Sequence, residues 1–519
     1  MVDRYPVRKP GSEFCAQVNG NGREFYSWLI PIRRVLFASQ LGRCLQRKGK
    51  SVSPTKQTEA KNNVPRRKKR GWCQQDRPVI EPNAAGIDVG AREMYVAIPP
   101  DRDPDPVRVF KTFTADLEAL IDWLVESGIT TVAMEATGVY WIPLYQMLED
   151  RGVRACLVNA RHMKNVPGRR TDWHECQWIQ YLHATGLLRP AFRPDQDVCA
   201  VRTLLRHRNE LVRMAAQHVQ HMQKALTQMN VHIHHVISDI TGLSGLAIVD
   251  AILAGERDVA KLAALRHRSI HADEETIRKS LAGDWRPEHL FTLNQSRQMY
   301  ANCGINIEAC DQKIAEVLGA FEPQVDLTAQ PLPPEPGPSR KRRTKRTGDF
   351  RFEVRTEAYR LFGVDVTRIP GLNELAIPLF SEVGRDLAPR FPTANHFASW
   401  LALCPDNDKS GGKVLWTGVR KINNRAAQMF RMGASSLHHS HSPLGDFLRR
   451  MKAKLGPTAG ITATAHKIAI IFYTLVTKQV EYDDSIWAKR DEQRQKRFEA
   501  KLKRQARRLG YQLVPIEPV

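Results

Sequence analysis

Residues 85–90 read Ala-Gly-Ile-Asp-Val-Gly, a short apolar run that ends on a carboxylate and a glycine. A run of this length predicts a buried strand. Its carboxylate then projects from the edge of a sheet, where the glycine allows a substrate or another backbone to come close. Further candidate strands follow at residues 94–98 and 107–113. Three strands in direct succession favour hairpins at this end of the sheet.

Helices and strands then alternate along the chain. Apolar residues at helical spacing predict helices over residues 117–127, 141–151 and 172–188, and short buried runs predict strands at 130–134 and 155–158. The complete order is three strands, helix, strand, helix, strand, helix. It predicts an α/β domain with a mixed sheet, part hairpin and part parallel, and it matches an RNase H-like fold.

Four carboxylates fall at the ends of these predicted elements. Asp88 and Glu135 end two strands, and Asp172 and Glu175 lie three residues apart on one helix face. Taken singly, Asp172 also fits a charge in the first turn of a helix, and Glu135 fits a solvated strand end. Taken together on one scaffold, they favour a shared acidic site that can bind two Mg²⁺ ions and act on a phosphodiester.

Beyond this domain the pattern is mainly helical. Over residues 195–236, apolar residues recur mostly at intervals of three and four residues. This spacing predicts a long helix and a coiled-coil or dimerisation element. Residues 237–320 also read as helical. A proline-rich and basic stretch at 322–350 predicts a linker or insertion. A second ordered part spans 358–480, and residues 488–508 predict a highly charged helix.

The chain of 519 residues has room for about three domains of roughly 100–200 residues each. We expect six segments in order: a basic extension, the α/β domain, a helical oligomerisation region, a basic linker, a mostly helical domain and a charged tail. Their bounds are 1–82, 83–192, 193–321, 322–357, 358–482 and 483–519.

The loop at residues 404–418 offers a second kind of chemistry. Ser410 precedes Gly411-Gly412, which predicts a flexible and exposed turn. A serine there is a candidate nucleophile toward phosphorus, although an ordinary serine–glycine turn has the same sequence. Ser435 and Ser436 are weaker candidates because they lie within a helical pattern. The neighbouring candidates for contact with nucleic acid are Lys409, Gly411, Gly412, Lys413, Arg420 and Arg425.

Two further features each allow two interpretations. Residues 369–372, Ile-Pro-Gly-Leu, resemble a helix-hairpin-helix turn in which Gly371 exposes backbone N–H groups to a phosphate, or they form a plain turn between helices. Five histidines have no carboxylate or cysteine at metal-site spacing, and they are interpreted as polar-face residues or RNA contacts rather than zinc ligands. They are His218, His221, His232, His234 and His235.

The composition indicates a polyanionic partner. Lys and Arg number 78 against 55 Asp and Glu, a formal charge of +23, and nucleic acid is the default partner for such an excess. An anionic membrane is the rival, but the longest apolar run, residues 468–476, is far shorter than the ~20 residues of a membrane span. Nine cysteines without a C-x-x-C pair favour reduced thiols and a cytoplasmic setting.

Several stretches resemble DEDD-type insertion-sequence transposases, the 110/1111 insertion-sequence family. The acidic motifs of that family are matched at residues 86–90, 134–140 and 170–178. Its C-terminal transposase domain is matched at residues 411–415, 423–427 and 461–467. The resemblance covers about residues 83–260 and 358–480. One departure is Glu175, which stands where the family usually has an aspartate.

The resemblance implies a fold and a function. The first domain would resemble a Holliday-junction resolvase and hold Mg²⁺ at its four carboxylates. Ser410 would be the nucleophile of a recombinase that forms a phosphoserine intermediate. The two sites would meet from different subunits or domains of a homo-oligomer, a dimer or tetramer. The partners would be donor and target DNA and a noncoding guide RNA (a bridge RNA), in the prokaryotic cytoplasm at the nucleoid.

Two other functions remain open. An actin-like ATPase or sugar kinase shares the core of the fold, and residues 86–90 resemble its first phosphate loop. Such an enzyme also needs a second Asp-x-Gly loop and an adenosine motif, which the sequence lacks. A non-catalytic RNA- or DNA-binding protein would carry the acidic set as a vestige, and Glu175 is the feature that favours it.

Overall fold

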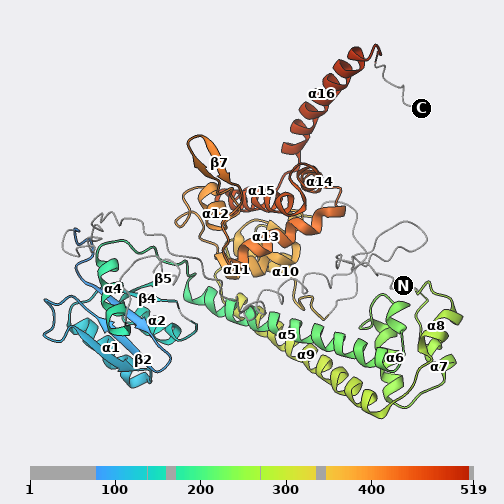
Figure 1. Cartoon of the computed structure of the whole chain (residues 1–519), viewed down its shortest axis with the longest axis horizontal. Coiled ribbons are helices and arrows are strands. Elements are labelled where there is room, and N and C mark those ends of the chain that lie inside the picture. Colours follow the sequence, from blue (N-terminus) through green and yellow to red (C-terminus); the bar gives the residue numbers. More distant parts are fainter. Residues whose placement is uncertain (1–76, 137, 159–170, 269, 335–346, 513–519) are drawn as a thin grey trace, which may run out of the picture. The chain divides into compact units, whose positions relative to one another are not determined.

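The computed structural model describes residues 77–136, 138–158, 171–268, 270–334 and 347–512 (Figure 1). Most of the predicted extension 1–82 and the basic run 340–346 lie outside the described residues, as do Thr137 and Arg170 of the acidic motifs.

The described chain forms two compact units. One consists of residues 213–304, and the other combines residues 77–212 with residues 305–512.

A five-stranded sheet is the centre of the first ordered domain. Its strands are β1 (Ala84–Val89), β2 (Glu93–Ala97), β3 (Val107–Lys111), β4 (Thr131–Glu135) and β5 (Arg154–Val158). Their order in space is β3-β2-β1-β4-β5. β2 pairs antiparallel with β1 and β3, whereas β4 pairs parallel with β1 and β5. The structure confirms the predicted mixed sheet, part hairpin and part parallel.

Helices cover both faces of this sheet (Figure 1). They are α1 (Thr114–Glu126), α2 (Trp141–Asp150) and α4 (Asp172–Ala184). On one face, Ile87 of β1 packs in one core with Leu120 of α1 and Leu144 of α2. On the other face, Ala133 of β4 packs with Ile179 of α4. β1 and β4 are nearly continuous apolar runs because both of their faces are covered.

Residues 350–487 form a mostly helical domain, as the sequence predicts for this part. Its helices are α10 (Val354–Phe362), α11 (Ala376–Val383), α12 (Ala394–Trp400), α13 (Arg425–Ser436), α14 (Pro443–Leu455) and α15 (Pro457–Lys478), with short 3-10 turns η5 (Val366–Arg368), η6 (Asn373–Leu375) and η7 (Leu437–His439). Edge-to-face phenylalanines fill the core: Phe362, Phe380, Phe397, Phe430 and Phe472.

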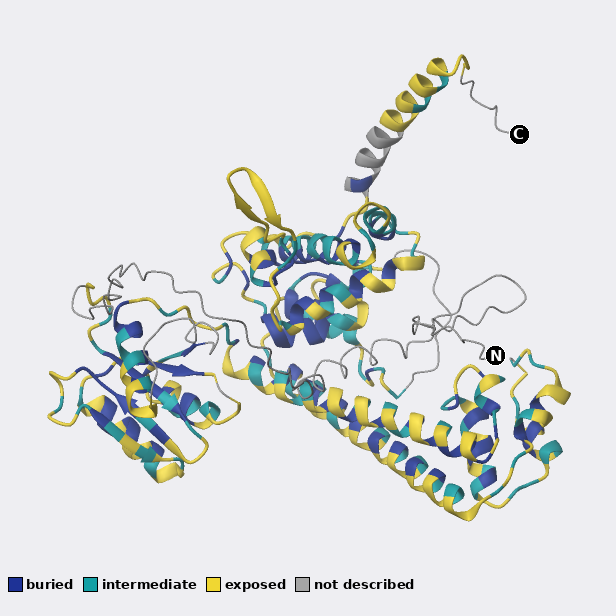
Figure 2. Cartoon of the chain, in the orientation of Figure 1, coloured by how far each residue is buried: buried dark blue, intermediate teal, exposed yellow. Residues whose placement is uncertain are grey.

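A two-stranded hairpin interrupts these helices. β6 (Asp408–Ser410) pairs antiparallel with β7 (Lys413–Trp416) around Gly411-Gly412. The sequence predicted only a loop at residues 404–418, because strands this short leave no periodic signal. Every residue of both strands is exposed, and Figure 2 shows the hairpin as exposed along its length.

Among the described helices, α15 is long and apolar enough to cross a membrane. Half of its most apolar stretch is buried inside the helical domain. Ile468, Ala469 and Phe472 are fully buried there, in the same core as Phe362 and Phe430. Because the domain core uses the apolar face of α15, we assign it as a core helix and not as a membrane span.

Two helices of 33 residues, α5 (Gln196–Gln228) and α9 (Pro287–Gly319), belong to both compact units. Val201 of α5 and Ile314 of α9 join the core of the helical domain. The unit at residues 213–304 is therefore smaller than the helical region 193–321 expected from the sequence, and a coiled coil is not confirmed.

The unit at residues 213–304 has a core of its own. The C-terminal part of α5 and the N-terminal part of α9 pack in this core with four shorter elements. These are η4 (Ile233–His235), α6 (Leu243–Leu253), α7 (Val259–Ala264) and α8 (Glu274–Leu281). Met222, Ile233, Ile248 and Ile277 are fully buried in this core.

A charged helix, α16 (Ser485–Arg508), follows the helical domain and agrees with the predicted helix at residues 488–508. Trp487 near its start is buried, with the Lys467 ammonium 5.3 Å from the centroid of its ring. From residue 496 onward nearly every side chain is exposed, which suits a helix without an apolar face.

Candidate active site

The site begins with a very close approach between β1 and α4. A Cβ atom placed on Gly86 would lie 2.1 Å from the backbone N of Gln180 and 2.4 Å from the carbonyl oxygen of Cys176. No side chain fits at Gly86, so glycine is required for α4 to reach the sheet at this point. Since side chains alternate along a strand, Asp88 projects from the same face of the sheet as Gly86.

Glu135 lies next to Asp88 on the neighbouring strand. β1 and β4 are parallel with Ile87 opposite Met134, so the following residues on each strand are Asp88 and Glu135. Neighbouring strands lie about 4.8 Å apart. Ala133 packs against Ile179 of α4, which assigns Glu135, two residues later, to the α4 face as well. The register therefore brings two of the predicted carboxylates to one face and one end of the sheet.

The first turn of α4 brings the other two carboxylates. Thr171 is the N-cap residue, and its hydroxyl oxygen accepts a hydrogen bond from the backbone N–H of His174. Asp172 and Glu175 lie in the first turn, where the helix dipole favours negative charge. Asp172 lies one turn before Cys176, which is buried against the sheet, so this turn faces the strand ends.

The electrostatics place Asp88 and Asp172 in one neighbourhood. Burial, with the carboxylates of Asp88 and Asp172 adding to it, raises the pKa of the Cys176 thiol to about 12. Burial and the Glu93 carboxylate, followed by Asp172 and Asp88, raise the pKa of Tyr95. A carboxylate raises these pKa values because it disfavours a second negative charge nearby. Asp88 and Asp172 therefore act on the same two neighbouring groups.

Tyr95 lies beside the candidate carboxylates and was not predicted from the sequence. It pairs with Asp88 in the antiparallel register of β1 and β2, and its hydroxyl donates a hydrogen bond to Glu93 at 3.3 Å. The signal that could have found it is the hairpin register, because cross-strand partners share a face.

The chemistry of the four carboxylates fits a hard cation, since Mg²⁺ prefers oxygen ligands. Glu135 is buried, Asp88 and Glu175 are half-buried, and Asp172 is exposed. Within the described part of the chain, no three of them bring an oxygen within 4.8 Å of one another. The structure thus gathers the four residues on one face without closing them into a ligand cage.

Ser410 is the last residue of β6 and lies directly before the hairpin turn. Gly411 and Gly412 have φ values of 55° and 78°, which a two-residue turn of the I′ type requires and glycine adopts readily. Ser410 pairs with Lys413 across this turn and is exposed. The predicted exposure of the serine is confirmed, on a hairpin whose register shifts between Asp408 and Lys409.

The basic candidates lie around this hairpin. Lys409 and Lys413 flank the turn and are exposed. Arg420 donates a hydrogen bond to the Ser399 hydroxyl at 3.1 Å, and a second to the Ser399 carbonyl. Arg425 is the first residue of α13, next to the N-cap Asn424.

Two other candidates are explained by local packing. Gly371 has a φ of 94°, and a Cβ there would lie 2.4 Å from the carbonyl oxygen of Gly433 in α13. This approach accounts for the glycine, while a phosphate contact at Gly371 stays a prediction. Ser435 and Ser436 lie in α13 as predicted, and the Ser436 hydroxyl donates to the Gly433 carbonyl at 2.8 Å.

Two family models match the chain. Residues 85–231, which include the four carboxylates, match the DEDD-type IS110 model, described as a transposase. Residues 365–447, which include Ser410, match a model described as the transposase IS116/IS110/IS902 family. A comparison with curated proteins gives no match.

The mixed sheet, its carboxylates and the first match are consistent with an RNase H-like DEDD domain, and they define a DNA transposase as the class. Both matches name the same kind of transposase, and the chain belongs to the IS110 family of DEDD-type transposases.

Proposed function

We propose that this transposase cuts and rejoins DNA strands with two sets of groups, the acidic face of the sheet and the serine of the hairpin. The observation that carries the proposal is the meeting of the β1 and β4 ends, at Asp88 and Glu135, with the first turn of α4. Four carboxylates on one face suit phosphodiester chemistry better than any packing role, because buried or crowded like charges destabilise a fold.

The acidic face would hold the divalent ions. Asp88, Glu135, Asp172 and Glu175 are the proposed ligands, and Mg²⁺ is the proposed cation. Bound there, divalent ions would stabilise the negative charge that develops on the attacking and leaving oxygens of a phosphodiester. Tyr95 would help to orient the phosphate, because it lies opposite Asp88 in the register of β1 and β2.

Ser410 would be the nucleophile. Its Oγ forms a bond to phosphorus while the bond from phosphorus to a deoxyribose oxygen breaks. The hydroxyl proton leaves Ser410, and the departing sugar oxygen takes up a proton. The phosphoserine ester conserves the energy of the broken bond, so a second DNA hydroxyl can attack it and release the serine. Lys409, Lys413, Arg420 and Arg425 would hold the phosphates around this step.

We infer that the two sets of groups meet in a homo-oligomer, a dimer or tetramer. An exposed serine on a projecting hairpin suits delivery to DNA held by another domain or subunit. The partners would be donor and target DNA together with a noncoding guide RNA. A net charge of +23 suits such partners. The guide RNA would recognise the DNA sequence by base pairing, while Lys and Arg side chains would bind the phosphates. The protein would then act at the nucleoid.

A strand-exchange assay tests the proposal. The full chain is combined with Mg²⁺, donor and target DNA, and RNA transcribed from the flanks of its element. We expect Ser410→Ala and Asp88→Asn each to lower exchange about 1,000-fold or more, as removal of a group that acts in the reaction does. Omission of the RNA should abolish exchange.

Ser435→Ala is the matched control, since Ser435 is an exposed serine on α13 of the same domain. Its exchange rate should equal that of the unaltered protein. Full exchange by both Ser410→Ala and Asp88→Asn would refute the proposed chemistry. Absence of exchange by the unaltered protein would leave DNA or RNA binding without catalysis as the function.

A further inference from the structure

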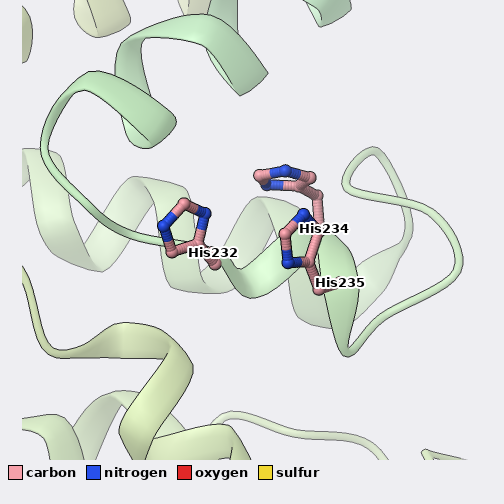
Figure 3. Close-up of side chains that lie close together, drawn as sticks. All are labelled: His232, His234 and His235. Carbon is pink, nitrogen blue, oxygen red and sulfur yellow. The ribbon is translucent and has the colours of Figure 1, made fainter. Parts of the chain in front are cut away.

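Three histidines come together on a turn that the proposed chemistry does not use. His232, His234 and His235 lie on or beside η4, directly after α5 (Figure 3). Ile233 between them is fully buried in the core of the 213–304 unit. The backbone N–H of His232 donates to the carbonyl of Ser280 on α8 at 2.8 Å. The turn is therefore held at both the core and α8.

The three imidazoles are close enough to share one ion. Each offers a ring nitrogen, and these nitrogens all lie within 4.8 Å of one another. The rings of His232 and His235 stack with centroids 5.1 Å apart, and those of His234 and His235 are 4.4 Å apart. Residues three apart eclipse each other on a 3-10 turn, which is why His232 and His235 meet.

Two of these ring nitrogens are buried and have no hydrogen-bond partner among the described residues: Nδ1 of His232 and Nδ1 of His234. A buried polar atom without a partner is uncommon and calls for an explanation such as an ion. The other nitrogen of His232, Nε2, lies 2.9 Å from the side-chain oxygen of Asn230. A histidine that ligates a metal typically donates its second ring N–H to such an acceptor.

We propose that His232, His234 and His235 form a binding site for a divalent transition-metal ion of the Zn²⁺ class. Imidazole nitrogens suit Zn²⁺, Ni²⁺ or Cu²⁺ and do not suit Mg²⁺, so this site is chemically distinct from the carboxylate face. Three protein ligands leave a fourth position for water or another donor. The bound ion would fix the three imidazole rings of the turn that follows α5.

In the sequence, no carboxylate or cysteine stands at metal-site spacing from these histidines, so spacing alone favoured polar-face residues or RNA contacts. The structure supplies a set made only of imidazoles, from a turn whose 3-10 geometry the sequence did not reveal.

Isothermal titration of the full chain with Zn²⁺ tests the site. The protein is prepared without a polyhistidine tag and stripped of metal with EDTA. The titration is made in excess Mg²⁺, which occupies the carboxylate face. We expect one Zn²⁺ ion per chain, bound at least ~10-fold more weakly by His235→Gln and not bound by the triple variant His232→Gln/His234→Gln/His235→Gln. His235 is exposed, so its single replacement leaves the fold intact.

A second histidine pair is the matched control. His438 and His439 are exposed neighbours at η7, with ring centroids 4.6 Å apart. His438→Gln/His439→Gln should bind Zn²⁺ as the unaltered chain does. Absence of Zn²⁺ binding by the unaltered chain, or equal binding by the triple variant, would overturn the proposal.

Asn230 would orient the His232 ring through its side-chain oxygen. This role can be tested without replacing any of the three histidines. Its φ of 57° is left-handed, so Asn230→Gly keeps the backbone conformation and removes only the acceptor. We expect about 10-fold weaker Zn²⁺ binding by Asn230→Gly and near-normal binding by Asn230→Asp. The absorption spectrum of the Co²⁺-loaded chain should change with Asn230→Gly, and an unaltered spectrum and affinity would contradict the assigned orientation of His232.

Discussion

Gly86 is the residue on which the position of the acidic face depends most. Its missing Cβ allows the backbone of α4 to touch β1, and α4 carries Asp172 and Glu175 to the strand ends. Close approach was expected from the sequence at Gly90, and the structure adds Gly86 as the position that α4 approaches.

We expect Gly86→Ala to destabilise the α/β domain by about 1–3 kcal/mol, since the added methyl group overlaps backbone atoms of α4. DNA strand exchange should fall with it, because α4 must shift away from Asp88. Chemical denaturation followed by circular dichroism measures the first effect.

Gly319→Ala is the matched control for this change. Gly319 is exposed at the end of α9, and a Cβ there meets nothing within 4 Å. Equal stability of Gly86→Ala and Gly319→Ala would show that the approach of α4 to β1 is looser than described.

At the scale of elements, the periodic patterns predicted the order of strands and helices in the sheet domain, but not every end. α4 ends at Ala184 instead of residue 188, because Gly186 takes a φ of 67° and the N–H of Leu187 returns to the carbonyl of Leu182 at 2.9 Å. α5 ends at Gln228 instead of residue 236, where Asn230 has a left-handed φ. Both helices end at a local change of backbone conformation, which the spacing of apolar residues does not predict.

The sequence predicted the candidate site residues that lie at the ends of strands. It did not predict a residue whose position depends on the register between two strands. Asp88 and Glu135 follow apolar runs, so their strand ends could be read from the sequence. Tyr95 could not, because it joins the site through its register with Asp88. The β6–β7 hairpin was also missed, since seven strand residues and two glycines carry too short a pattern.

A buried ion pair joins the N-terminal half of α5 to the C-terminal half of α9. Its removal should destabilise the contact between these two helices. Arg208 and Asp311 are both almost fully buried, with a hydrogen bond of 3.1 Å from the guanidinium to the carboxylate. Arg208 also lies 4.0 Å from the centroid of the Phe350 ring. Asp311→Ala leaves a buried unpaired charge and should cost about 3–5 kcal/mol in the free energy of unfolding.

Glu316→Ala on the same helix is the control, because its pair with Lys313 is exposed and such pairs contribute only about 0–1 kcal/mol. The double variant Arg208→Met/Asp311→Leu should recover much of the loss, since it removes both charges together. A loss in Asp311→Ala no larger than in Glu316→Ala, measured by denaturant titration, would contradict a role for the buried pair.

In the whole molecule, the two proposed kinds of chemistry belong to two separately matched parts of the chain. The first match contains the carboxylates at the sheet, and the second contains the hairpin with Ser410. Along the sequence, the basic run at residues 340–346 and the helix α16 add positive charge outside both matched ranges. This distribution suits a protein that holds nucleic acid by its phosphates and cuts it at a few acidic and hydroxyl groups.

We propose above all that Ser410 becomes covalently linked to DNA during exchange and that the acidic face is needed for this step. The most direct measurement is mass spectrometry of the protease-digested adduct, trapped with a donor DNA nicked near the exchange point. We expect a nucleotide phosphate on the peptide that contains Ser410, absent in Ser410→Ala and strongly reduced in Asp88→Asn. An adduct on any other residue, or complete exchange without an adduct, would contradict it.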